Sequence, residues 1–212
     1  MCDDSGNCRN TSTFSFATLD LTAPYLVSRA ENNLTNSSIK ISVEINELGY
    51  SKIYYGTSPA SLNQVTPQSA LETSADFQIS SLNEKTAYYY SVNMCDDSAN
   101  CRNSSVFNFA TLDLTEPNAP KDLILEVINS DNNIKIKWDS ALDDAVNYNI
   151  YISDTPNNFD FSAPNATTAN NEYTDNTAST AKQRYYVVRA EDAAGNEETN
   201  AYIVGKYDLE LS

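Results

Sequence analysis

The sequence has no histidine, only five glycines and few positive charges. Its 212 residues carry 13 Lys and Arg against 29 Asp and Glu, a net charge of −16 at pH 7. Without histidine the chain lacks the commonest general base and a common zinc ligand. The scarcity of glycine argues against a phosphate-binding loop, and the acidic balance repels nucleic acid and anionic lipid. The composition therefore favours neither an enzyme nor a nucleic-acid-binding protein.

Long apolar segments are also missing. No run of about 18 apolar residues occurs, so the sequence predicts no transmembrane helix and no direct membrane insertion. The first residues, MCDDSGNCRN, lack a basic region followed by an apolar stretch, so no signal peptide is expected here. Hydrophobic residues still make up 41% of the chain and aromatic residues 10%, which is enough for a packed core.

An internal repeat organises the chain. The segment CDDSGNCRNTSTFSFATLDLTAP at residues 2–24 returns 93 residues later as CDDSANCRNSSVFNFATLDLTEP at residues 95–117. A weaker third copy lies at residues 185–198, which align with residues 89–102. This spacing is that of a small β-sandwich domain. We therefore expect a partial repeat at residues 1–22, followed by domains at residues 23–116 and 117–212.

Within each repeat, β-branched and aromatic residues alternate with polar ones. Ile39, Ile41 and Val43, for example, alternate with polar residues, which predicts a strand with one buried face. Turn residues cluster between such segments, as at residues 46–49. Further strands are expected at residues 51–56, 77–81, 88–94, 106–111, 123–127, 134–138, 148–152, 185–190 and 201–204. The sequence thus predicts an all-β fold of tandem Ig-like sandwiches.

Several stretches resemble fibronectin type III domains. IKIKWDSALDDAVNYNIYIS, at residues 134–153, resembles their B and C strands, and RYYVVRAEDAAGNEE, at 184–198, resembles the F strand and the F–G turn. SSLNEKTAYYYSV, at residues 80–92, matches the E–F corner. The resemblance covers roughly residues 23–207. It implies tandem fibronectin type III domains of a bacterial or archaeal extracellular or cell-surface protein.

Two positions depart from the pattern of this family. Val43 stands at the core tryptophan position that Trp138 holds in the second domain, so we expect Tyr54 or Phe77 to fill the first core. Arg184 stands where the first domain has Tyr88. This puts the tyrosine corner, a buried ring whose hydroxyl bonds the upstream backbone, in question in the second domain.

The four cysteines form two pairs of equal spacing around an acidic turn: Cys2 with Cys8, and Cys95 with Cys101. The third copy has Glu191 and Glu197 at the equivalent positions, so both partners are present or absent together. We therefore predict two local disulfides, with free thiols or a metal site as alternatives. A lone Cys-x5-Cys pair without histidine is a poor zinc site. Disulfides in turn indicate an extracellular protein.

Acidic residues gather near the ends of predicted strands. Asp96, Asp97 and Asp113 are candidate calcium ligands, because Ca²⁺ prefers carboxylate and carbonyl oxygens. Further acidic pairs are Asp3-Asp4, Asp143-Asp144 and Glu191-Asp192. The alternative is a solvated acidic turn, since no stretch has the spacing of a helical calcium loop. No other cofactor is expected.

Sequons of the form N-x-S/T mark candidate glycosylation sites in an extracellular protein. Chance alone gives about five in a chain this rich in Asn, Ser and Thr, so their number does not indicate glycosylation. The sequons lie at Asn10, Asn33, Asn36, Asn103 and Asn165.

Residues 1–22 repeat only the turn and last strand of a domain. One interpretation is a segment of a longer tandem array. The other is a strand that completes the sheet of a neighbouring copy, because extended segments bind at exposed sheet edges.

The links at residues 19–26 and 112–123 contain proline, which predicts semi-rigid joints. We therefore expect a non-catalytic extracellular structural or adhesion segment. It would form a semi-rigid rod that assembles with other copies or neighbouring surface proteins into a filament or layer. The alternative is an accessory module of a secreted hydrolase, acting as a spacer or binding glycan, with Tyr55, Tyr89 and Tyr151 as candidate stacking residues.

Overall fold

The computed structural model describes residues 1–10, 12–128, 133–141, 144–178 and 183–207. These residues form antiparallel strands and no helix, which confirms the predicted all-β class. The chain divides into two compact units, Met1–Leu112 and Asp113–Ser212. The predicted second domain began at residue 117, and residues 1–22 are here part of the first unit. None of the described residues forms a helix that is long and apolar enough to cross a membrane.

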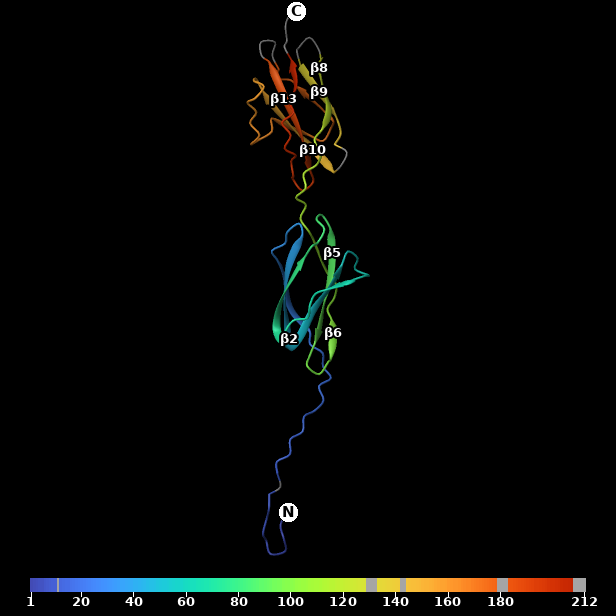
Figure 1. Ribbon diagram of the computed structural model, residues 1–212, viewed down its shortest axis with the longest axis vertical. Helices are drawn as coiled ribbons and strands as arrows, with labels where there is room; N and C mark the ends of the chain where they lie inside the picture. Colours follow the sequence, from blue (N-terminus) through green and yellow to red (C-terminus); the bar gives the residue numbers. More distant parts are fainter. Residues whose placement is uncertain (11, 129–132, 142–143, 179–182, 208–212) are drawn as a thin grey trace, which may run out of the picture. The chain divides into compact units, whose positions relative to one another are not determined.

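Unit 1 is a sandwich of two antiparallel layers (Figure 1). Its strands are β1 (Leu26–Asn32), β2 (Ser38–Gly56), β3 (Gln64–Val65), β4 (Glu72–Ser80), β5 (Ala87–Cys95), β6 (Cys101–Asn103) and β7 (Phe107–Ala110). The first part of β2 pairs with β1 and β4. Its last part pairs with β3 and β5, and β6 and β7 follow one another along β5.

Strand β2 passes from one layer to the other without a break. Residues 46–49, predicted as a turn, belong to this strand, so that prediction is wrong. The pairing with β4 shifts register between Glu44 and Gly49, which marks the irregularity. At Gly49 an added β-carbon would lie 2.8 Å from the carbonyl oxygen of Cys95. Glycine therefore allows the two backbones to approach this closely.

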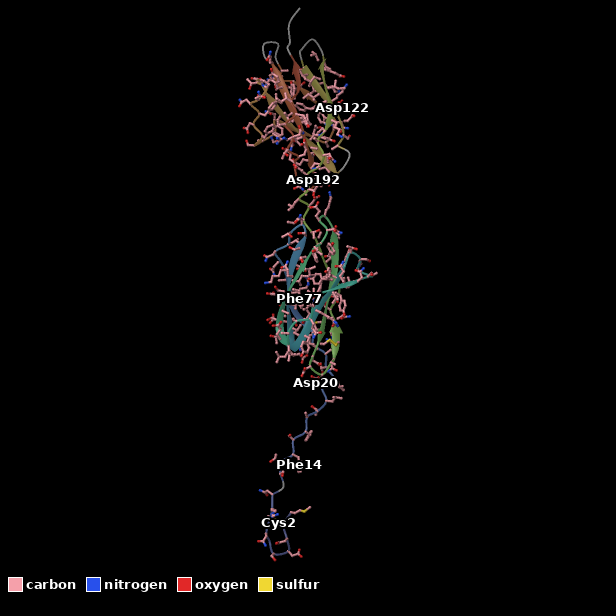
Figure 2. The ribbon with its side chains drawn as sticks, in the orientation of Figure 1. Cys2, Phe14, Asp20, Phe77, Asp122 and Asp192 are labelled. Carbon is pink, nitrogen blue, oxygen red and sulfur yellow. A yellow bond between two sulfur atoms is a disulfide. The ribbon has the colours of Figure 1, made fainter. Side chains whose placement is uncertain are left out.

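In the core of unit 1, β2 contributes buried aliphatic side chains, and β4 and β5 contribute both aromatic and aliphatic ones. Val43 is buried in place of a tryptophan, and Phe77 fills the core as predicted, with 6% of its surface exposed (Figure 2). Tyr54 does not enter the core, because its ring lies beside the Lys52 ammonium. Tyr90 is fully buried instead, and this ring was not identified from the sequence as a core substitute.

The tyrosine corner predicted for the first domain is present. The hydroxyl of Tyr88 accepts a hydrogen bond of 2.9 Å from the backbone N–H of Asn83, and the ring is buried. Stacking against Phe109 of β7, with ring centroids 5.6 Å apart, fixes the ring from the other side. The corner thus ties the approach to β5 to the last strand of the unit.

Unit 2 is a sandwich of a three-stranded and a four-stranded sheet (Figure 1). Its strands are β8 (Lys121–Ile128), β9 (Asn133–Asp139), β10 (Ala145–Ser153), β11 (Ala166–Thr168), β12 (Glu172–Asp175), β13 (Arg184–Asp192) and β14 (Val204–Tyr207). The sheets have the orders β12-β9-β8 and β11-β10-β13-β14. Trp138 is buried and meets the Tyr148 ring edge-on, 5.2 Å between centroids, which confirms its core position.

In unit 2 a hydrogen bond from a tyrosine to a buried carboxylate takes the place of the tyrosine corner of unit 1. Arg184 pairs with Asp154 instead of forming a corner. Two residues further along β13, the Tyr186 hydroxyl donates 2.9 Å to Asp175, which is fully buried and also accepts from the backbone and hydroxyl of Thr177. Burial and the Asp175 charge raise the pKa of Tyr186 well above its usual range. The phenol therefore stays a donor.

Candidate functional site

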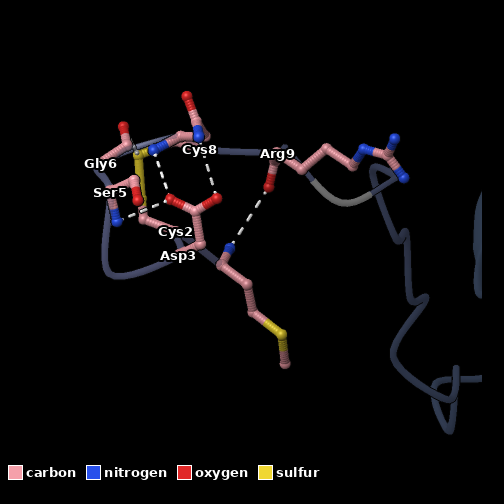
Figure 3. Close-up of a disulfide and its surroundings, with 8 residues drawn as sticks. Cys2, Asp3, Ser5, Gly6, Cys8 and Arg9 are labelled. Carbon is pink, nitrogen blue, oxygen red and sulfur yellow. Dashed lines mark hydrogen bonds between the residues drawn. A yellow bond between two sulfur atoms is a disulfide. The ribbon is translucent and has the colours of Figure 1, made fainter.

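Three copies of one acidic hairpin are the most regular feature of the structure. In the first copy, Asp3 Oδ1 accepts hydrogen bonds from the backbone N–H groups of Ser5 and Asn7, at 3.0 and 2.9 Å (Figure 3). The Asn7 side-chain amide donates 2.9 Å to the other oxygen of this carboxylate. These bonds, led by those from Asn7, hold the pKa of Asp3 below its usual range.

The other two hairpins repeat this arrangement. Asp96 accepts from the backbone and side chain of Asn100, both at 2.8 Å, and Asp192 accepts from Asn196 at 2.9 and 2.8 Å. Burial alone would raise the pKa of each Asp, but the hydrogen bonds outweigh it and the pKa values of Asp96 and Asp192 lie below the usual range. The repeated Asp and Asn therefore define the turn.

Both predicted disulfides are present. Cys2–Cys8 closes the first hairpin and Cys95–Cys101 the second, with Cα atoms 3.9 and 4.1 Å apart, and all four cysteines are oxidised. Each pair consists of directly opposite residues of an antiparallel bridge. The covalent link therefore fastens a hairpin whose backbone geometry the Asp and Asn already set.

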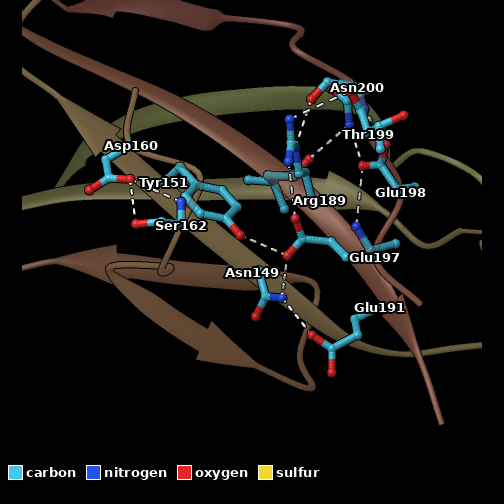
Figure 4. Close-up of polar contacts among 12 residues, drawn as sticks. Asn149, Tyr151, Asp160, Ser162, Arg189, Glu191, Glu197, Glu198, Thr199 and Asn200 are labelled. Carbon is cyan, nitrogen blue, oxygen red and sulfur yellow. Dashed lines mark hydrogen bonds and ion pairs between the residues drawn. The ribbon is translucent and has the colours of Figure 1, made fainter. Parts of the chain in front are cut away.

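The third hairpin has the same bridge without the disulfide. Glu191 and Glu197 lie opposite each other, as the cysteines do in the other copies. Asn149 of β10 donates 2.6 Å to a carboxylate oxygen of each glutamate, and the Tyr151 hydroxyl donates 2.7 Å to Glu197 (Figure 4). Arg189 pairs with Glu197 at 3.1 Å. Side-chain hydrogen bonds thus replace the covalent link.

The second and third hairpins also hold the segment that precedes the first strand of their own sandwich. In unit 1 the Asn100 side chain donates 3.1 Å to the backbone carbonyl of Asp20. In unit 2 the Asn196 side chain donates 3.2 Å to the carbonyl of Asp113. The repeated asparagine therefore has a second role, which the repeat in the sequence does not reveal because its partner lies about 80 residues earlier.

Carboxylates gather at this end of unit 2. Oxygen atoms of Asp113, Asp144 and Asp192 lie within 4.8 Å of one another, and Asp192 is buried. Of the predicted calcium ligands this group includes Asp113, whereas Asp96 and Asp97 belong to unit 1. The sequence placed Asp192 in one of the acidic pairs but did not name it as a calcium ligand, although its alignment with Asp96 was a signal. Asp143 lies outside the described residues.

Three carboxylates at this separation are the oxygen donors that Ca²⁺ prefers, although Ca²⁺ takes six to eight ligands in all. Calcium binding stays a prediction.

The asparagine side chains of the five sequons differ in their exposure and in their hydrogen bonds. Asn36 is half-buried and donates to Glu84, whereas the other four asparagines are exposed. The side-chain oxygen of Asn103 accepts from Asn93, and that of Asn165 accepts from the backbone of Ile152. Glycosylation at Asn10, Asn33, Asn36, Asn103 and Asn165 stays a prediction.

The three tyrosines considered for sugar stacking do not form an exposed row. Tyr151 is buried with 2% of its surface exposed, and Tyr55 packs against the core of unit 1. Tyr89 is half-buried beside a hollow of about 360 Å³ that Arg29, Val106 and Asn108 also line. Of these three candidate stacking residues, only Tyr89 therefore lies beside a surface hollow.

Residues 12–22 carry apolar side chains that the sandwich of unit 1 does not cover. Phe14 and Phe16 are 84% and 92% exposed, in a stretch without strand pairing (Figure 2). Their counterparts in the repeat, Phe107 and Phe109 of β7, pack against the rings of β5. One sequence therefore occurs twice, once packed into a sheet and once exposed.

Comparison with known proteins gives matches among solved structures. No protein-family model matches the chain, and no curated protein matches it. Both similar structures described here are fibronectin type III segments. The FN1–FN3 domains of chicken CNTN1 share 14% identity with a TM-score of 0.47, over 88% of this chain and 66% of that one, slightly under two thirds. A two-domain segment of chicken tenascin shares 12% identity with a TM-score of 0.37, over 86% of this chain and 98% of that one.

Proposed function

We propose that this chain is a non-catalytic extracellular structural or adhesion segment, a semi-rigid rod of fibronectin type III-like units that assembles with other copies into a filament or layer. Two disulfides support an oxidising, extracellular location. The repeated hairpins and two similar sandwiches support a structural role. Bacterial or archaeal origin belongs to the same proposal and rests on the sequence resemblance.

The proposed rod is supported chiefly by the hydrogen bonds that hold Leu112 and Asp113, the last residue of unit 1 and the first of unit 2. The backbone N–H of Leu112 donates to Thr35, and its carbonyl accepts from Lys85, both in unit 1. The next residue, Asp113, is held through its carbonyl by Asn196 of unit 2. Pro117 and Pro120 follow and are buried. No residue between these two anchored positions is left to act as a flexible linker.

A pair of matched variants tests this reading. Asn196→Ala removes the hydrogen bond to Asp113 at the joint, whereas Asn100→Ala removes the equivalent bond to Asp20, outside the joint. At concentrations where the chains are monomeric, small-angle X-ray scattering should show a broader range of particle dimensions for Asn196→Ala and an unchanged inter-unit distribution for Asn100→Ala. Equal profiles for wild type and Asn196→Ala would contradict the role of this bond.

A further inference from the structure

The chain carries two exposed apolar surfaces of different shape. One is the extended segment of residues 13–21, with Phe14, Phe16, Leu19 and Leu21 between 75% and 92% exposed. The other is a hollow of about 670 Å³ on unit 2, lined by residues 118–123 together with Tyr202 and Ile203. Tyr202 is 73% exposed and Ile203 39%. We propose that residues 13–21 of one copy bind in this hollow on a second copy.

The segment has the side-chain pattern of an edge strand. Phe14 and Phe16 are two residues apart, so both rings project to the same side of an extended chain. Residues 106–114, which match it closely, include β7, where the equivalent rings are covered by Tyr88 and Tyr90 of β5. The repeat thus shows that this sequence pairs as a strand when an apolar surface and a sheet edge are present.

The hollow on unit 2 offers such an edge. Strand β8 pairs with β9 at Lys121 and again at Ile124, with a register shift between them. Asp122 has a φ of 50°, which takes the backbone out of the extended conformation at this point. Asp122 and Leu123 therefore fall in the register shift of the β8–β9 pairing, and both line the hollow, where an incoming strand can reach the β8 edge.

Size and charge agree with this occupant. Two phenylalanine side chains bury about 300–500 Å² in total, and a standard interface buries about 800 Å² on each partner, so the segment supplies much of one side. Residues 12–19 carry no charge, which avoids adding to the repulsion between copies of net charge −16. Asp20 follows Phe14 and Phe16 in the segment, and the exposed Lys121, which lines the hollow, can form an ion pair with it.

The alternative acceptor, the β5 edge of a second copy, is already occupied. There β7 is tethered three residues after β6, and a short tether gives an effective concentration on the order of millimolar. A segment from another copy would displace β7 only at similar protein concentrations. The hollow has no such competitor among the described residues, so it is the preferred acceptor.

An interface between two different surfaces is heterologous and gives open chains of copies. It rests on the proposed structural function and supplies the contact for its filament. Light scattering of the wild-type chain at about 100 µM should therefore show a mass that rises with concentration. Phe14→Ser/Phe16→Ser and Tyr202→Ser/Ile203→Ser should each be monomeric, and Leu48→Ser, which changes an exposed leucine elsewhere, should behave as wild type.

Mixing the two monomeric double variants is the decisive experiment. Each retains the surface that the other has lost, so an equimolar mixture should form a dimer of one copy of each and nothing larger. A monomeric mixture, a wild-type chain that stays monomeric, or a closed wild-type dimer would overturn the proposal. Unchanged melting temperatures of both variants exclude misfolding, and joint stiffness is measured separately on the monomeric variant, so the rod and the interface are tested independently.

Discussion

At the residue scale, one hairpin is fastened in two ways. The Asp and Asn that shape the turn occur in all three copies, so the fastening is an addition to a turn that is already defined. A disulfide across a loop this short contributes about 2 kcal/mol by limiting the unfolded chain. In unit 2, Arg189, Asn149 and Tyr151 contact Glu197 instead, so the polar copy depends on these side-chain contacts and the covalent copies on oxidising conditions.

The equivalence of the two fastenings predicts that Glu191→Cys/Glu197→Cys forms a disulfide. The two positions already face each other in an antiparallel bridge, as the native cysteines do. After air oxidation, the intact mass should show three disulfides and no alkylatable thiol, whereas Glu191→Cys alone should keep one reactive thiol. The gain of about 2 kcal/mol from the closed loop should be partly offset by the lost bonds to Glu197. Two reactive thiols in the oxidised double variant would contradict the equivalence.

Calcium binding can also be tested by substituting single residues. If Asp113, Asp144 and Asp192 hold Ca²⁺, about 10 mM calcium should stabilise unit 2 by about 1–3 kcal/mol, as expected for a site of extracellular affinity. Calorimetry should show this rise for Asp96→Asn and not for Asp192→Asn, two substitutions that break the equivalent side-chain contact, with Asn100 and with Asn196, in different units. An unchanged melting temperature of the wild type in calcium would contradict the predicted calcium site.

The residue-scale features differ in how far the sequence predicted them. The disulfides could be predicted because paired cysteines appear and disappear together among the repeats. The contacts of Glu197 could not, because Asn149 lies 48 residues away and is brought near only when β10 pairs with β13. The grouping of Asp113 with Asp192 was missed for the same reason.

At the element scale, the alternation of apolar and polar residues predicts where the strands lie, but it does not predict where they begin, bend or end. Alternating residues of β2 are buried as predicted, yet the turn expected at residues 46–49 is continuous strand. Turn-forming residues there serve a bend between layers, and Gly49 is required by the close approach of Cys95. The last strand, expected at residues 201–204, begins at Val204, so Tyr202 and Ile203 stay unpaired and exposed.

Edges of the sheets carry charged side chains that oppose unspecific pairing. Arg29 and Glu31 lie on β1, and Asp76 on β4 pairs with Lys40 of β2. Charged edges of this kind keep sheets from joining indiscriminately. Residues 12–19, which carry no charge, lack this protection.

The corner between β4 and β5 should stabilise unit 1 through a single hydroxyl. Tyr88→Phe leaves the N–H of Asn83 without its partner, which should lower the free energy of unfolding by about 1–3 kcal/mol. Tyr54→Phe removes a hydroxyl outside the core and should change it by less than about 0.5 kcal/mol. Chemical denaturation of both variants measures the difference; equal stabilities would show that the corner bond contributes nothing.

At the scale of the whole molecule, the absence of histidine, the high negative charge and the repeat support the proposed non-catalytic extracellular segment. The sequence predicted two sandwiches and a partial repeat from periodicity alone. It could not show that Leu112 and Asp113 are anchored to different units, since those bonds come from distant residues. These two anchors are the physical basis of the proposed stiffness.

The central claim is that the two units behave as one semi-rigid body in solution. Nitrogen-15 relaxation of the monomeric Phe14→Ser/Phe16→Ser variant tests it most directly, since each unit reports its own rotational correlation time. The account predicts that amides of unit 1 and unit 2 share one anisotropic tumbling model. Separate, shorter correlation times, as for independent domains of about 100 residues each, would contradict it.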